Sequence, residues 1–100
     1  MKPENTEERS PATAQVQVNT ERMLITKWSF APGEQTGWHR HMMDYAVVPL
    51  TNGTLLIEAK SGNQSFQLVA GATYSRSAGV EHNVVNASDH PVAFVEIELR

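Results

Sequence analysis

The feature that most constrains the fold is a regular alternation of short apolar segments with turn-forming residues. No apolar period of 3.6 residues persists for three helical turns anywhere in the chain. Turn signals recur every eight to twelve residues or so, a spacing typical of all-β sandwiches and barrels. The predicted strands are 21–30, 45–51, 54–59, 64–70, 72–77, 82–87 and 91–99.

Glycine-containing turns predict where these strands end. Pro32-Gly33 ends the first strand, and Ser61-Gly62-Asn63 and Gly71 separate later ones. Asn52-Gly53 is the dipeptide that most strongly indicates a two-residue hairpin, so we expect 45–51 to pair with 54–59. In the last strand Val95, Ile97 and Leu99 alternate with Phe94, Glu96 and Glu98, which predicts a half-buried strand.

The length of 100 residues indicates one domain. Residues 1 to 14 are rich in Glu, Pro, Thr and Ser and have almost no large apolar side chain, so we interpret them as a flexible N-terminal arm before a barrel domain at 15–100. An alternative is a short strand around Val16 and Val18 that pairs with a partner subunit.

Charge and composition argue against several classes of partner. A net charge of −3 without a Lys/Arg cluster argues against nucleic acid. No apolar run approaches the roughly 20 residues that span a bilayer, and residues 1–20 lack the apolar middle of a signal peptide, so we expect no membrane partner and a cytoplasmic location. Without cysteine, neither a disulfide nor a thiolate ligand is available.

Residues Gly37 to His41 read Gly-Trp-His-Arg-His. In an extended strand alternate side chains share a face, so His39 and His41 would point the same way. Neutral imidazole is the commonest metal ligand among side chains, and this pair would form half of a metal site. Two partly exposed histidines without a metal are the alternative interpretation.

Two spaced motifs resemble those of the small single-domain cupins. The first has Gly33, His39, His41 and Gly53 at the family's spacing, and the second has Gly71, Gly79, His82 and Asn86, with Ser77 where proline is usual. The resemblance implies a single-domain, all-β double-stranded β-helix, the cupin jelly-roll barrel. It also implies that His39, His41 and His82 bind a divalent transition-metal ion. Three imidazoles do not distinguish Zn, Fe, Ni, Mn and Cu.

The chain departs from the family at the usual glutamate ligand. Counting from His41 and from Gly53 places Tyr45 and Ala46 at that position. We therefore consider Asp44 and Tyr45 as candidate catalytic residues: Asp44 as a ligand or as a turn residue, Tyr45 as a hydrogen-bond donor to a bound water or substrate. Tyr74 and Arg76 are candidate substrate-binding residues, with the cation suited to a carboxylate.

The run from His39 to Tyr45, followed by the valine-rich strand, is similar to that of a cupin subgroup labelled β-alanine degradation proteins. This similarity implies a small polar acid or carbonyl compound as ligand, with a metal-dependent oxygenase, isomerase or lyase as the enzymatic hypothesis. The alternative hypothesis is a non-catalytic cupin that binds or senses a small molecule. We expect a homodimer, as the family habit implies.

Overall fold

The computed structural model describes residues 9–100, which form nine β-strands and no helix. No helix in this described part could therefore cross a membrane. The strands are β1 (Thr13–Asn19), β2 (Met23–Phe30), β3 (His39–Arg40), β4 (Tyr45–Pro49), β5 (Gly53–Glu58), β6 (Gln64–Leu68), β7 (Tyr74–Arg76), β8 (Glu81–Asn86) and β9 (Val92–Leu99).

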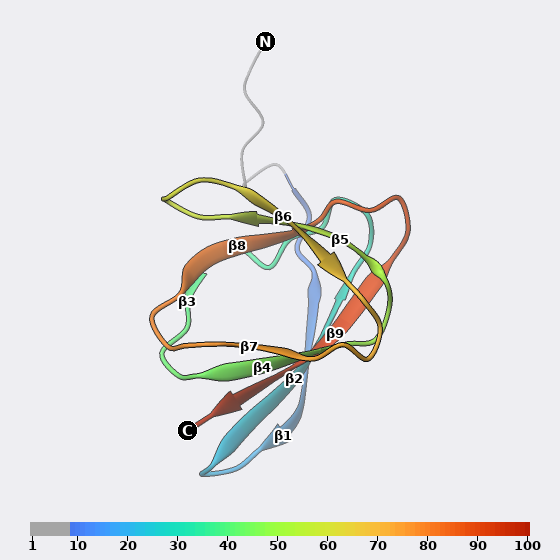
Figure 1. Ribbon diagram of the computed structural model, residues 1–100. Helices are drawn as coiled ribbons and strands as arrows, with labels where there is room; N and C mark the ends of the chain where they lie inside the picture. The colour runs from blue at the N-terminus through green and yellow to red at the C-terminus, as the bar shows by residue number, and fades with distance from the viewer. Residues whose placement is uncertain (1–8) are drawn as a thin grey trace.

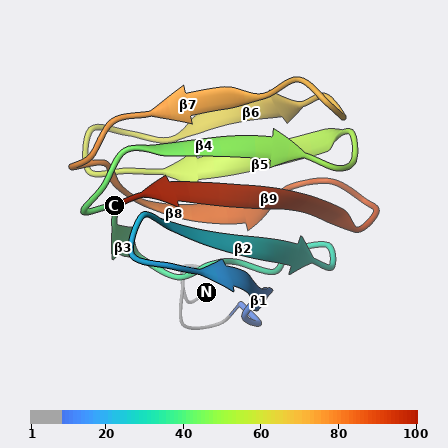
Figure 2. The same cartoon turned by 90° about the horizontal axis from the view of Figure 1, so that it is seen from below.

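The strands form two antiparallel sheets that face each other (Figures 1 and 2). The larger sheet has the order β1-β2-β9-β4-β7, and the smaller has the order β3-β8-β5-β6. The chain passes repeatedly from one sheet to the other, as a double-stranded β-helix does. The all-β jelly-roll prediction is confirmed.

The space between the sheets is filled by one apolar core. Inward-facing positions alternate along the strands, as β4 shows with Tyr45, Val47 and Pro49 buried and Ala46 and Val48 less so. The buried hydrophobic cluster consists of Phe30, Tyr45, Val47, Leu55, Leu68, Val84, Val92 and Phe94. This core holds the strands that carry the histidines.

The predicted Asn52-Gly53 hairpin is wrong, because β4 and β5 do not pair. β4 pairs with β7 and β9, whereas β5 pairs with β6 and β8 in the other sheet. Gly53 is not among the glycines with positive φ, so it does not serve a primed turn. A Cβ there would instead collide with Cγ1 of Val92 and lie 3.0 Å from Oγ of Ser88. Close packing between the sheets is what requires glycine here.

The structure describes part of the segment that we interpreted as an N-terminal arm. Residues 9–12 lie along Gln35: the amide of Ala12 donates to the Gln35 carbonyl at 2.7 Å, and the Gln35 amide donates to the Ser10 carbonyl at 3.1 Å. Thr13 already belongs to β1. Backbone hydrogen bonds, which composition does not reveal, hold this stretch. Residues 1–8 lie outside the described part of the chain.

The strand expected around Val16 and Val18 is present as β1, and it pairs with β2 of the same chain. All seven of its residues are exposed, including Val16 at 58%. Because β1 ends the sheet order, its second edge has no strand partner within the described residues.

Candidate metal centre

His39, His41 and His82 meet at one end of the smaller sheet. His39 on β3 lies directly opposite His82 on β8. The ladder continues past β3, since the His41 amide donates to the Val80 carbonyl at 2.8 Å and the Gly79 amide donates to the His41 carbonyl at 2.7 Å. Two segments far apart in sequence therefore present three imidazoles from neighbouring strands.

The Nε2 atoms of the three rings converge. Nε2 of His41 lies 2.9 Å from Nε2 of His39 and 3.3 Å from Nε2 of His82, and one ring nitrogen from each of the three lies within 4.8 Å of the others. Nitrogens bound to one ion at about 2.0–2.1 Å, with tetrahedral or octahedral angles, stand roughly 2.8–3.4 Å apart. The three histidines thus fit a metal that keeps further coordination positions open.

The lone pairs needed for ligation are available at neutral pH. Nδ1 of His39 donates to the Gly37 carbonyl at 2.8 Å, which leaves Nε2 of the neutral ring without a proton. Burial, with the neighbouring His39, lowers the pKa of both His41 and His82 to about 4. Both rings are therefore neutral near pH 7.

The opposite sheet supports His41 from two sides. The ring of Tyr45 on β4 stacks on the His41 ring with centroids 3.8 Å apart and planes 18° apart. Glu96 on β9 places Oε1 3.9 Å from Nδ1 of His41, longer than a hydrogen bond. Burial and the adjacent Glu98 carboxylate raise the pKa of Glu96, and burial raises that of Tyr45. A neutral acid and a protonated phenol therefore lie beside the site.

Sequence reasoning did not identify Glu96 as part of the site. Glu96 lies on the Nδ1 side of His41, away from the Nε2 cluster, and His41, Glu96 and Glu98 form a second group of metal-compatible ligand atoms within 4.8 Å. The sequence pattern that could have indicated Glu96 is its alternation with Phe94, which places both side chains on one face of the strand. In the structure this face of β9 is buried, whereas the face with Val95 and Ile97 is less so.

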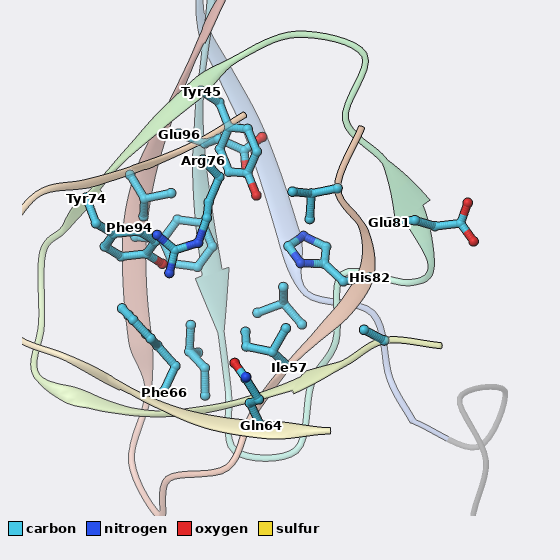
Figure 3. Close-up of a pocket in the computed structure, with 15 residues that line it drawn as sticks. Tyr45, Ile57, Gln64, Phe66, Tyr74, Arg76, Glu81, His82, Phe94 and Glu96 are labelled. Atoms are coloured by element: carbon cyan, nitrogen blue, oxygen red, sulfur yellow. The ribbon is translucent and has the colours of Figure 1, made fainter. Parts of the chain in front are cut away.

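A cavity of about 210 Å³ opens beside His82 within the barrel. Tyr45, Tyr74, Arg76 and His82 point into it (Figure 3). The Arg76 guanidinium lies 4.8 Å from the centroid of the Tyr74 ring and 5.6 Å from that of Phe66. Burial raises the pKa of Tyr74 to about 12. The cavity thus combines apolar walls with one cation and two phenols.

A second cavity, of about 270 Å³, lies against His39 and His41, and Trp28, Met42 and Met43 contribute to its walls. Glu96 lines both cavities. The histidine cluster is therefore approached from two sides.

Asp44 is not placed with the histidines. Its side chain is exposed, and Oδ1 accepts a hydrogen bond of 2.8 Å from the Ala78 amide. The carboxylate therefore binds an amide far along the chain, and not the nearby backbone amides that the alternative interpretation of Asp44 expected. His90, the fourth histidine, lies in an exposed turn, with Nε2 3.0 Å from the Asn52 carbonyl.

Comparisons with known proteins agree with the fold. Residues 26–98 match the family model described as a cupin domain. The chain is 55% identical over 92 residues to the β-alanine degradation protein BauB of Pseudomonas aeruginosa, covering 92% of this chain and 97% of that protein. A cupin domain from Bordetella pertussis superposes with a TM-score of 0.91 at 52% identity, covering 93% of this chain and 97% of that one. The polyketide cyclase RemF of Streptomyces resistomycificus shares the fold at a TM-score of 0.72 and 14% identity, covering 99% of this chain and 79% of that one.

Proposed function

This chain belongs to the cupin domain family, and on that premise we propose that it binds one divalent transition-metal ion through His39, His41 and His82. We propose further that it binds and transforms a small carboxylic acid or carbonyl compound beside that ion. The observation that carries the proposal is the convergence of three Nε2 atoms at a cavity that also contains the Arg76 guanidinium.

The residues present suit the ion. Three imidazoles suit Zn, Fe, Ni and Cu, and an additional oxygen ligand would favour Fe or Mn, so the ligand atoms do not select one ion. The ion, when bound, would supply Lewis acidity and open coordination positions. The carbonyl of Gly37 accepts a hydrogen bond from the outer nitrogen of His39, the kind of support that ligating histidines usually have. The carboxyl group of Glu96 faces the outer nitrogen of His41 at 3.9 Å, beyond hydrogen-bonding distance.

The cavity residues suit a small acid. The guanidinium of Arg76 is a planar donor group that suits a carboxylate, and it lies against the rings of Tyr74 and Phe66. Its Nη1 also donates to the Ser75 carbonyl at 2.9 Å, and the other nitrogens offer further donors. The raised pKa of Tyr45 keeps its hydroxyl group protonated, so Tyr45 donates a hydrogen bond or a proton to a substrate oxygen. A volume of about 210 Å³ lies below the roughly 300–1,000 Å³ of sites for drug-sized ligands. We therefore propose a compound of a few carbons.

The BauB name suggests the chemical context. That relative is named for β-alanine degradation, and it is 55% identical over nearly the whole of both chains. We propose that this chain acts on β-alanine or on a short acid or carbonyl compound related to it, within amino-acid catabolism.

Metal content measured on tag-free protein tests the first part. We expect close to one ion per chain, located by anomalous scattering at the three Nε2 atoms. The variant His39→Ala should lose the ion. His90→Ala is the matched control, because it removes an exposed histidine outside the cluster and should retain the ion. Equal metal content in both variants would refute the site.

The second part is tested with a panel of short acids and carbonyl compounds that includes β-alanine. We expect Arg76→Met to weaken binding of carboxylates about tenfold or more without changing metal content. Binding without turnover across metals and oxygen levels would identify the non-catalytic cupin instead. Unchanged affinity of Arg76→Met for carboxylates would refute the assignment of Arg76.

We also propose that the chain forms a homodimer. The support is β1, a fully exposed edge strand with Val16 and Val18 on its surface. Size-exclusion chromatography with light scattering tests the proposed dimer. A monomeric mass at high micromolar protein concentration would refute the proposal. The cytoplasmic location stays a prediction.

A further inference from the structure

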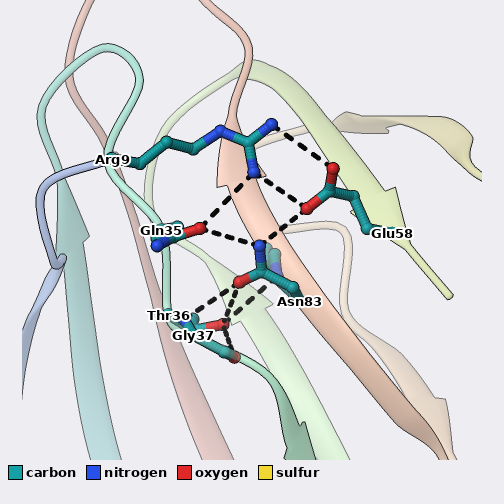
Figure 4. A network of polar contacts seen from close by, with 7 residues as sticks. Arg9, Gln35, Thr36, Gly37, Glu58 and Asn83 are labelled. Carbon is teal, nitrogen blue, oxygen red and sulfur yellow. Dashed lines mark hydrogen bonds and ion pairs between the residues drawn. The ribbon is translucent and has the colours of Figure 1, made fainter. Parts of the chain in front are cut away.

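A buried polar network lies behind the histidines, centred on Asn83 (Figure 4). Asn83 directly follows His82 on β8 and is 0% exposed. Its Nδ2 donates to Oε1 of Gln35 at 2.9 Å and to Oε1 of Glu58 at 2.8 Å, and its Oδ1 accepts from the Gly37 amide at 2.9 Å. Both donors and the acceptor of a fully buried amide are used, so losing any partner leaves a costly unpaired group.

Arg9 completes this network from the N-terminal side. Its Nη1 lies 2.8 Å from Oε1 of Glu58 and 3.4 Å from Oε1 of Gln35, and its Nη2 lies 3.3 Å from Oε2 of Glu58. The Arg9 and Glu58 side chains are only 13% and 15% exposed. Hydrogen bonding to Arg9 lowers the pKa of Glu58. Arg9 therefore neutralises the carboxylate that holds Asn83.

The other side of the network leads to His39. Gly37, held by Asn83 through its amide, has a φ of +90° and offers its carbonyl to Nδ1 of His39 at 2.8 Å. Oγ1 of Thr36 donates to the same carbonyl at 2.9 Å and accepts from the Val84 amide at 3.2 Å. The orientation and the tautomer of His39 thus depend on where Asn83 holds Gly37.

We propose that Arg9, acting through Glu58 and Asn83, is a positioning residue for the metal ligand His39, so that Arg9 raises the affinity of the site for metal. The inference rests on the proposed metal function. The effect of Arg9 on His39 is indirect, because it passes through Glu58, Asn83 and Gly37 in turn.

The test uses the full chain with Arg9→Met, which keeps an apolar stem but removes the charge and the donors. Zinc affinity is measured by competition with a chromophoric chelator, under conditions where urea titration shows each variant to be more than about 99% folded. We expect affinity to fall about tenfold, the lower end of the effect of outer-sphere partners. Lys60→Met is the matched control, because it removes an exposed ion pair with Glu81, which lies on the same strand as Asn83. We expect the zinc affinity of this variant to be within about twofold of wild type.

A rescue variant separates positioning from general destabilisation. In Arg9→Met with Glu58→Gln, the uncompensated charge is gone while an oxygen remains for Nδ2 of Asn83. We expect zinc affinity to recover most of the tenfold loss. This double variant also serves if Arg9→Met alone does not fold.

A readout without metal distinguishes failure of this inference from failure of the metal site. Nitrogen NMR of the metal-free protein at pH 8 reports the tautomer of His39, and we expect the Nδ1–H form in wild type and a mixture in Arg9→Met. If wild type does not bind zinc, the proposed metal function fails, and the tautomer still decides the positioning role. Wild-type tautomer and zinc affinity in Arg9→Met would overturn the inference.

Discussion

Replacing Glu96 with glutamine should change metal affinity and metal-free stability in different directions. Glu96 and His41 have side chains only 10% and 4% exposed, and Oε1 lies 3.9 Å from Nδ1 of His41. Two full charges at this separation interact by about 4 kcal/mol at an effective dielectric constant of 20. A metal-bound imidazole carries only part of the ion's charge, so the interaction is smaller than this.

In the metal-loaded protein we expect Glu96→Gln to lower affinity by about ten- to a hundredfold, the range for carboxylates that support ligating histidines. This corresponds to about 1.4–2.7 kcal/mol. In the metal-free protein the raised pKa of Glu96 shows that the ionised form is disfavoured by burial and by Glu98. A neutral amide of the same shape avoids that cost, so at pH 8 the free energy of unfolding should stay equal or rise.

Chelator competition measures the first effect, and urea unfolding of the metal-free protein measures the second. Glu81→Gln is the matched control, because Glu81 adjoins His82 in sequence but has its side chain 41% exposed and paired with Lys60. Unchanged affinity in a folded Glu96→Gln variant would show that the carboxyl group does not support His41. An equal loss in Glu81→Gln would show that the effect is only one of net charge.

Three further predictions concern packing, pH and metal removal. Gly53→Ala should lower the free energy of unfolding by about 1–3 kcal/mol, because the new Cβ collides with Val92; a change below about 0.5 kcal/mol in urea titrations would contradict the packing role of Gly53. In the metal-free protein, lowered pKa values mean that unfolded His41 and His82 bind protons that the folded rings do not, so the contribution of these rings to stability should fall as the pH drops from about 6.5 to about 4, by up to about 3 kcal/mol for buried His41. The raised pKa of Glu96 contributes with the opposite sign in both proteins compared below, so the histidine contribution is read from the difference in slope. Urea titrations of wild type and His41→Gln across that range check the sign, and equal slopes would refute the assignment. Removing the metal with a chelator should lower the thermal midpoint by roughly 10–20 °C relative to protein with free ion at about 100 times its Kd. At that concentration, binding stabilises the folded state by about 2.7 kcal/mol, and this free energy gives the stated shift in a domain of this size. A calorimetric midpoint that does not move would show that the folded protein does not bind the ion preferentially.

The sequence was most informative where its motifs could be matched to those of the family that it resembles. The alternation of His39 and His41 and the second motif around His82 predicted three imidazoles in one place, and the structure brings them together. Tyr45, which lies at the position of the missing glutamate, stacks its ring on that of His41. Asp44, the other candidate, caps an amide in a turn instead.

The features that sequence did not predict depend on tertiary packing. Alternation in β9 indicates two faces without saying which is buried, and the less apolar face with Glu96 lies inside because Phe94 and Val92 share it. Asn52-Gly53 has the chemistry of a hairpin turn, yet the flanking strands belong to different sheets and Gly53 serves a close contact. Arg9 lies in a polar segment, and the role proposed for it depends on its ion pair with Glu58, a carboxylate far along the chain.

Among the described strands, only β1 with β2 and β5 with β6 pair with a sequence neighbour, and His39 meets His82 through the long-range pairing of β3 with β8. Such pairings form late, because a long loop must close before they can. A nascent chain that has not yet released β8 from the ribosome offers two imidazoles and no third. We therefore expect the proposed three-histidine site to form only after β8 has been synthesised and has paired with β3.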